Sequence, residues 1–144
     1  MINIKNCITI YKPVGMVFDF MSTPENNFQW QYGTLESYRL ADGTSDNGSL
    51  FRSIGHLMGR RNIITFKVTE YMPGKKYDYQ SLSGPLQLYT SYTFENDKGA
   101  TKVNISIQAN VVNFIQENEG VLERAIGKQL KDNLAMLKKI LEAR

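Results

Sequence analysis

The last third of the chain constrains the fold most, because an alternating segment is followed there by a long amphipathic one. Between residues 100 and 111 the apolar residues fall on one parity: Val103, Ile105, Ile107, Ala109 and Val111. From about residue 119, helical spacing places seven apolar residues on one stripe: Leu122, Ile126, Leu130, Leu134, Leu137, Ile140 and Leu141. A strand with one apolar face belongs to a sheet that is buried on one side, and the helix likewise has one apolar face. The two dry surfaces are therefore expected to cover each other.

The first thirty residues predict one strand and two short helices. In residues 2–11, Ile2, Ile4, Ile8 and Ile10 share one parity, which is typical of a strand. Pro13 suits a helix start, and apolar residues recur at helical spacing over 14–21. Thr23 and Pro24 then match the N-cap and first position of a second short helix.

Residues 33–111 read as six strands separated by turn signals. The strand segments are 33–41, 49–57, 61–71, 75–82, 86–95 and 100–111, and the connections include Pro-Gly, Ser-Gly-Pro and Asn-Asp-Lys-Gly. Short connections favour an antiparallel meander. The predicted architecture is a single α+β domain over residues 1–144 with the order β-α-α-β6-α. A curved seven-stranded antiparallel sheet wraps on a long C-terminal helix, which starts between residues 113 and 119.

Several motifs resemble the START-like helix-grip superfamily known as SRPBCC, and its polyketide cyclase/dehydrase and lipid-transport branch. They are ITIYKPVGMVFDF (8–20), FQW (28–30), GSLFR (48–52), GRRNI (59–63), VTEYMPGKK (68–76), SGP (83–85), YTFENDKGATKV (92–103) and NLAMLKKILE (133–142). These motifs mark turns, strand edges and core over nearly the whole chain. The resemblance implies an internal cavity between sheet and helix that holds a lipophilic molecule. It assigns no catalytic residue, because members of the superfamily share a shape and differ in chemistry.

The residues themselves also favour a cavity, because the predicted dry surface carries polar groups. Leu88, Thr90 and Tyr92 share a parity, as do Tyr77 and Tyr79, and Asn133 lies beside the helix stripe. A mostly apolar hollow with a few polar groups suits an amphipathic ligand. The alternative is an ordinary sheet face whose tyrosines send their hydroxyls to the rim. The candidate ligand-binding residues are Phe66, Tyr77, Tyr79, Leu88, Thr90, Tyr92, Ile105, Ile107, Leu122, Ile126, Leu130 and Asn133. Tyr71 is expected at the rim.

Two further features of the long helix bear on the cavity. Gly120 and Gly127 lie seven residues apart beside the apolar stripe. Their missing side chains either leave room for a ligand or allow closer backbone packing. Glu119 and Glu123 project onto the sector of the stripe at its first turns, and a carboxylate is not buried cheaply. The first turns of the helix are therefore expected to be exposed to solvent and to border the entrance of the cavity.

The case for catalysis depends on His56, the single histidine. With a three-residue hairpin loop (58–60), His56 pairs with Asn62 and shares the inner face with Phe66. With a loop of two or four residues it pairs with Arg61 and faces water. The sequence leaves this register open. No metal or other cofactor is expected, since one His and one Cys far apart do not make a zinc site.

Composition narrows the remaining possibilities. The net charge of +3 is weak, and pairs such as Arg60-Arg61 and Lys75-Lys76 read as hairpin-tip charges, so no nucleic-acid partner is expected. Cys7 is the only cysteine and is expected to be buried; its isolation favours a reducing, cytoplasmic location. No apolar run is long enough to insert into a membrane. The protein is expected to be a monomer or homodimer.

Three functions follow from these observations. The first is binding or transfer of a lipophilic small molecule, either a lipid or a polyketide-like compound. The second is a cyclase, aromatase or dehydratase that uses tyrosine hydroxyls and His56. The third is a protein-interaction module, which would have no cavity of ligand size.

Overall fold

The computed structural model describes residues 1–40, 46–57, 59–111 and 119–144. Its strands are β1 (Ile2–Ile10), β2 (Thr34–Arg39), β3 (Leu50–Leu57), β4 (Arg60–Met72), β5 (Lys76–Ser81), β6 (Leu86–Asp97) and β7 (Ala100–Val111). Its helices are α1 (Val14–Met21), the 3-10 helix η1 (Pro24–Asn26), α2 (Asn27–Trp30) and α3 (Glu119–Glu142). The order of elements agrees with the one predicted.

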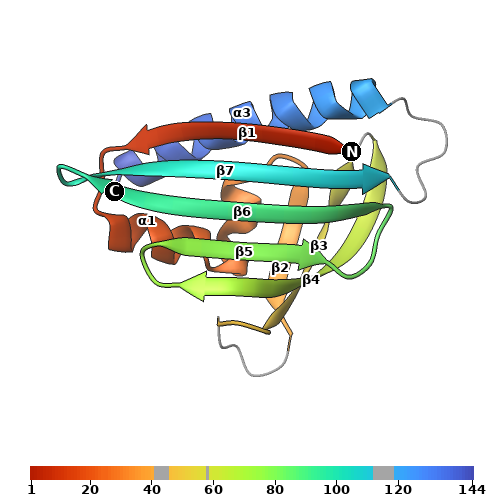
Figure 1. Ribbon diagram of the computed structural model, residues 1–144, viewed down its shortest axis with the longest axis horizontal. Coiled ribbons are helices and arrows are strands. Elements are labelled where there is room, and N and C mark those ends of the chain that lie inside the picture. Colours follow the sequence, from red (N-terminus) through yellow and green to blue (C-terminus); the bar gives the residue numbers. More distant parts are fainter. Residues whose placement is uncertain (41–45, 58, 112–118) are drawn as a thin grey trace.

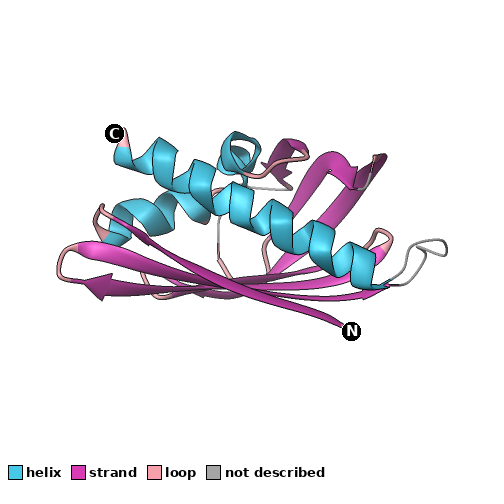
Figure 2. Cartoon of the chain, turned by 90° about the horizontal axis from the view of Figure 1, so that it is seen from above, coloured by secondary structure: helices cyan, strands magenta, loops and turns pink. Residues whose placement is uncertain are grey.

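The seven strands form one antiparallel sheet in the order β1-β7-β6-β5-β4-β3-β2. Figure 1 shows β1, β7, β6, β5 and the end of β4 running side by side, with the first part of β4, β3 and β2 turning away at one end. Seen from above in Figure 2, the sheet bends around α3, which crosses it diagonally, while the short helices lie on the same side. This is the helix-grip architecture that the sequence predicts.

The register of β1 against β7 fixes which residues face α3. Ile4 pairs with Ile107 and Ile8 pairs with Val103, so the apolar parities of both strands lie on the inner face. Cys7 pairs with Asn104 on the opposite face and is exposed. The prediction of a buried Cys7 was therefore wrong, and the physical reason is its odd position among even-numbered inward isoleucines.

The end of the sheet under α1 is closely packed. Phe18 of α1 is 1% exposed, and its ring makes edge contacts with Tyr71, Tyr77 and Phe94 at centroid distances of 5.4, 6.5 and 5.1 Å. Such aromatic pairs add to the stability that burial gives. Tyr71, expected at the rim, packs against this cluster and is half-buried.

The β6–β7 hairpin follows the turn chemistry of its sequence. Asp97 pairs with Ala100, and the two residues between them, Lys98 and Gly99, both have positive φ (54° and 89°). A two-residue loop with two left-handed positions matches the right-handed twist of the flanking strands. The hairpin thereby sets the register that places the apolar residues of β6 and β7 on the same face.

The apolar stripe of α3 is buried against the sheet. Its buried apolar residues are Leu122, Ile126, Leu130, Leu134, Leu137 and Leu141. Most of the interval predicted for the helix start lies outside the described residues, within which α3 begins at Glu119. None of the helices in the described part of the chain is long and apolar enough to cross a membrane.

Candidate ligand-binding cavity

A hollow of about 160 Å³ lies between the middle of the sheet and α3, and we call it the apolar hollow. Its lining comes from β3 to β7, α2 and α3. The lining residues are Trp30, Gln31, Leu57, Phe66, Tyr79, Leu86, Leu88, Thr90, Tyr92, Ile105, Ile107, Ile126, Gln129, Leu130 and Asn133. Aliphatic and aromatic side chains dominate, with a few hydroxyls and amides among them, as in many sites for small molecules.

A second hollow of about 160 Å³, the polar hollow, adjoins the first. The two share six lining residues: Gln31, Leu57, Phe66, Tyr79, Leu88 and Gln129. The polar hollow also reaches residues that are exposed, namely Tyr32, Gly33 and His56, so it connects the interior with the surface. An apolar protein cavity of about 150 Å³ can hold one benzene ring. Together the two hollows accommodate a small ligand.

Two tyrosine hydroxyls meet inside the apolar hollow. The Tyr79 and Tyr92 hydroxyl oxygens lie 2.8 Å apart, and the Gln31 side-chain amide donates to the Tyr92 oxygen at 3.4 Å. Burial raises the pKa of both phenols, most strongly that of Tyr92, which is 2% exposed. Both hydroxyls are therefore neutral at physiological pH and act as hydrogen-bond donors and acceptors.

The backbone of Tyr32 joins α2 to α3 at the wall of the hollow. The Tyr32 N–H donates to Oδ1 of Asn133 at 2.7 Å, and the Gln129 side-chain amide donates to the Tyr32 carbonyl at 2.6 Å. Asn133 thus uses its carbonyl oxygen to hold the wall. Trp30 and Gln31, immediately before Tyr32, are positioned against the tyrosine pair, with Trp30 and Tyr92 ring centroids 6.2 Å apart.

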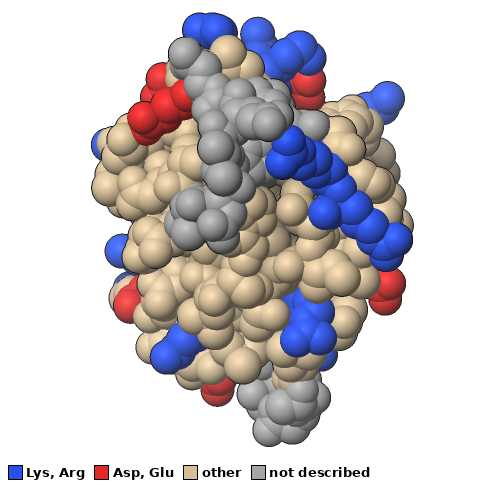
Figure 3. Space-filling view, turned by 90° about the vertical axis from the view of Figure 1, so that its right-hand side faces the viewer, with Lys and Arg blue, Asp and Glu red and all other residues tan. Residues whose placement is uncertain are grey.

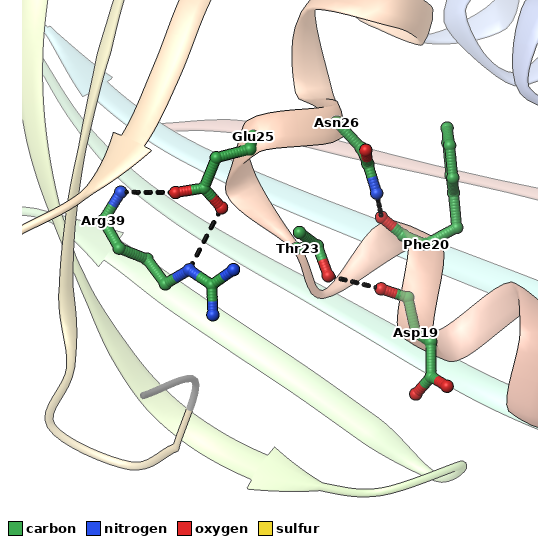
Figure 4. Close-up of polar contacts among 6 residues, drawn as sticks. All are labelled: Asp19, Phe20, Thr23, Glu25, Asn26 and Arg39. Atoms are coloured by element: carbon green, nitrogen blue, oxygen red, sulfur yellow. Dashed lines mark hydrogen bonds and ion pairs between the residues drawn. The ribbon is translucent and has the colours of Figure 1, made fainter. Parts of the chain in front are cut away.

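Short polar contacts fix the segment that precedes α2 (Figure 4). The Thr23 hydroxyl donates to the Asp19 carbonyl at 2.7 Å, and the Asn26 amide donates to the Phe20 carbonyl at 3.2 Å. Glu25 accepts from both the backbone N–H and Nε of Arg39, at 2.8 and 3.0 Å. The first two bonds tie η1 to the end of α1, and the Glu25–Arg39 pair ties it to β2. They hold α2, and with it Trp30, in place.

His56 lies in the outward of the two registers that the sequence leaves open. Leu57 pairs with Arg60, so only two residues separate β3 from β4, and His56 pairs with Arg61. The His56 side chain is exposed on the face opposite that of Phe51 and Phe66, which pair with each other on the inner side. His56 borders the polar hollow at its surface end, where its backbone N–H donates to the Gly33 carbonyl at 2.7 Å.

Ten of the twelve candidate ligand-binding residues line the apolar hollow: Phe66, Tyr79, Leu88, Thr90, Tyr92, Ile105, Ile107, Ile126, Leu130 and Asn133. Tyr77 and Leu122 face inward but lie outside both linings. Tyr77 is in the packed cluster with Phe18, and Leu122 packs with Ile2, Leu86 and Ile126. Trp30, Gln31, Leu57, Leu86 and Gln129 line the hollow without having been predicted.

Neither the two helix glycines, for which the sequence left two explanations open, nor Glu119 and Glu123 line the hollows. A Cβ atom added at Gly127 would meet no atom within 4 Å beyond its chain neighbours and the surrounding backbone of α3, and Gly127 is absent from both linings. Glu119 and Glu123 are exposed, as expected, but border neither hollow. Glu119 instead pairs with the amino group of Met1 at 2.6 Å. The surface end of the hollows is near Tyr32 and Gly33, farther along α3.

Charge is sparse around this end of the molecule. Figure 3 views the side that lies at the right of Figure 1; the visible centre is mostly uncharged, one row of Lys and Arg side chains crosses toward an edge, and further charged side chains of both signs lie around the rim. Neither hollow is lined by Lys, Arg, Asp or Glu among the described residues. The interior therefore offers hydrogen-bonding groups and apolar surface.

The chain matches the model of a known protein family, and its fold superposes on those of solved structures. The model of the family described as polyketide cyclase/dehydrase and lipid transport matches residues 1–142. A START superfamily protein from Mycobacterium smegmatis superposes with a TM-score of 0.83 at 11% identity, covering 99% of both chains. The Zhui aromatase/cyclase from Streptomyces sp. R1128 superposes with a TM-score of 0.80 at 14% identity, covering 99% of this chain and 94% of the other. At such identities the superpositions show a shared fold alone. No curated protein matches the sequence.

Proposed function

Because the chain belongs to the polyketide cyclase/dehydrase and lipid transport family of START-like helix-grip proteins, we propose that it binds a hydrophobic small molecule in the hollow between its sheet and α3 and transfers it unchanged. The family and the fold are those of hydrophobic-ligand-binding proteins. The identity of the cargo, a lipid or a polyketide-like compound, and the absence of turnover are parts of the proposal.

One observation carries it: the inner face is hollow between the centre of the sheet and α3, with Trp30 of α2 at its wall, although the aromatic cluster under α1 is closely packed. An apolar cavity that is not filled by side chains loses packing contacts, which destabilises the folded state. A guest molecule of matching shape restores those contacts. The connected polar hollow supplies the route to the surface beside Tyr32.

The direct test is native mass spectrometry of the purified protein, followed by thermal unfolding with a panel of lipids and polyketide-like compounds. We expect a co-purified hydrophobic molecule, or a panel member that raises Tm, because a ligand that binds only the folded state stabilises it. The single tryptophan, Trp30, lines the hollow, so its fluorescence reports the same event. An empty protein that responds to no member of a chemically varied panel would refute the proposal.

The two other functions have less support. A cyclase, aromatase or dehydratase needs a base, and the one histidine places its side chain on the outer face. An interaction module predicts no space for a ligand, against two adjoining hollows of about 160 Å³ each. A cytoplasmic location and a monomeric or dimeric state remain predictions of the sequence.

A further inference from the structure

We infer that the ligand is uncharged and presents a hydrogen-bond-accepting oxygen, such as that of a ketone or ester, to the Tyr79–Tyr92 pair. The inference rests on the proposed function and specifies the chemical class of the cargo. It depends on two observations: which hydrogen-bonding groups of the apolar hollow lack partners, and which charges could balance a charged ligand.

The lining of the apolar hollow includes donors that a ligand can use. The Tyr79 and Tyr92 hydroxyls carry two O–H donors, and the contact between them uses one. Tyr79 also forms hydrogen bonds with Thr90 and Gln31, so when Tyr79 donates to Tyr92 the Tyr92 O–H is the donor left for a ligand. Gln31 already donates to Tyr92, so the pair is not short of donors. Trp30 is 2% exposed, and its indole N–H has no hydrogen-bond partner among the residues that the structure describes. A buried donor without an acceptor is costly, and an acceptor on a ligand removes that cost.

The three residues that carry these donors lie together, with the Trp30 and Tyr79 rings 6.2 and 5.7 Å from that of Tyr92 between centroids. Thr90 pairs with Tyr79 across β5 and β6, and Tyr92 follows two residues later on the same face. Toward the start of β6 the inner face carries only Leu88 and Leu86. A bound molecule therefore has its oxygen at the tyrosine pair and its hydrocarbon part along these leucines and Ile126.

A carboxylate in this position would have no counter-charge. No Lys or Arg lines either hollow in the described part of the chain, and the His56 side chain is exposed. The undescribed segments 41–45, 58 and 112–118 have no Lys, Arg or His in their sequences, so they could supply none. An unpaired carboxylate is costly to bury, whereas a neutral carbonyl needs only hydrogen bonds.

The experiment compares two probes, 2-nonanone and octanoate, which share an alkyl chain and a carbonyl and differ in a methyl group in place of the charged oxygen. Binding is followed at pH 7.5 by Trp30 fluorescence and by calorimetry. We expect the ketone to bind at least about tenfold more tightly than the carboxylate. Equal or tighter binding of octanoate would overturn this inference and leave the proposed function standing. Binding of neither probe, nor of the wider panel, would overturn both.

The role of the hydroxyls is tested with the double variant Tyr79→Phe/Tyr92→Phe, because removing both partners of a buried pair costs little stability. We expect calorimetry to show a loss of ketone affinity of about five- to tenfold. The matched control is Tyr89→Phe, the same change at an exposed position of β6 on the outer face, which should leave affinity unchanged. Unchanged ketone affinity in the double variant would overturn the assignment of the oxygen to this pair.

Discussion

Under α1, the inner face of the sheet is covered by interlocking aromatic rings; under the first half of α3, the same face surrounds a hollow. In the first region Phe18 reaches down from α1 onto Tyr77 and Phe94. In the second, Trp30 of α2 packs beside Tyr92 at the wall, and Ile126 and Leu130 of α3 line a space that they do not fill. Both regions use strands with the same alternation. The difference lies in where the aromatic side chain of the covering helix packs: Phe18 of α1 lies in the middle of a ring cluster, whereas Trp30 of α2 lies at the wall and leaves space beside it. The sheet pattern alone therefore does not decide between core and cavity.

The largest expected difference between the two regions is in how much stability is lost when a side chain is truncated to alanine. Phe18→Ala should lower the free energy of unfolding by about 3–5 kcal/mol, because it leaves a new cavity in a filled region. Leu88→Ala should cost less than about 2 kcal/mol, since part of the Leu88 surface already faces empty space. Urea unfolding followed by circular dichroism measures both. Similar losses for the two variants would contradict the comparison.

The second prediction enlarges a side chain instead of truncating it, and compares the same kind of change at two positions of β7, one in the packed region and one at the hollow. Val103 is fully buried near α1, and Ile107 lines the apolar hollow on the same face of β7. Val103→Phe should cost about 1–3 kcal/mol through overpacking. Ile107→Phe should cost less than about 1 kcal/mol, because the ring enters existing space, and should weaken ligand binding. Thermal unfolding and calorimetry give the two quantities. A severely destabilised Ile107→Phe variant would mean that the space is not available.

A smaller change in stability is expected for a substitution in α3, and it is an increase, in contrast to the losses predicted above. Gly127→Ala should raise the free energy of unfolding by up to about 1 kcal/mol, because Ala is the better helix former and its Cβ meets no neighbouring atom. Ligand affinity should not change, since Gly127 lies outside the lining. Denaturant titration and a binding curve check both. Weaker binding would favour the alternative in which the missing side chain makes room for the ligand.

The smallest effect concerns the contact of Glu25 with Arg39, which ties η1 to β2 and so holds α2 at the wall of the hollow. Partial burial raises the pKa of Glu25, but hydrogen bonds from the backbone N–H groups of Arg39 and Glu25, with the Arg39 charge, outweigh it and leave the pKa lowered. A lowered pKa in the folded state gives stability that is present above the unfolded value of about 4.5 and lost as pH falls through the folded value.

Glu25→Gln should therefore lower Tm at pH 7, by less than the equivalent of about 1 kcal/mol because the pair is partly exposed. The gap between wild type and variant should close as the pH is lowered from 5 to about 3. Parallel thermal melts across this range provide the measurement. A gap that stays constant with pH would show that the charge of Glu25 does not contribute.

The sequence predicts the strands and their faces well because alternation is a local signal. Leu88, Thr90 and Tyr92 could be placed on one inner face by parity alone, and the hairpins fix how strands align. Parity would also have placed Cys7 outside. Trp30, Gln31 and Gln129 were missed because their positions depend on how α2 meets α3 at Tyr32, a contact between residues about a hundred positions apart. The face of the sheet that carries the His56 side chain could not be predicted, because lengthening the hairpin loop by one residue moves this side chain to the other face.

Trp30 and Cys7, each the single residue of its type, lie on opposite faces of the sheet, so energy transfer between them can report a change in their distance. The tryptophan is enclosed beside the hollow, and the thiol is exposed on the outer face of β1. A dye attached to Cys7 can accept energy from excited Trp30 without altering any side chain of the lining. Changes in transfer efficiency would then follow the movement of α2 relative to the sheet as cargo enters and leaves.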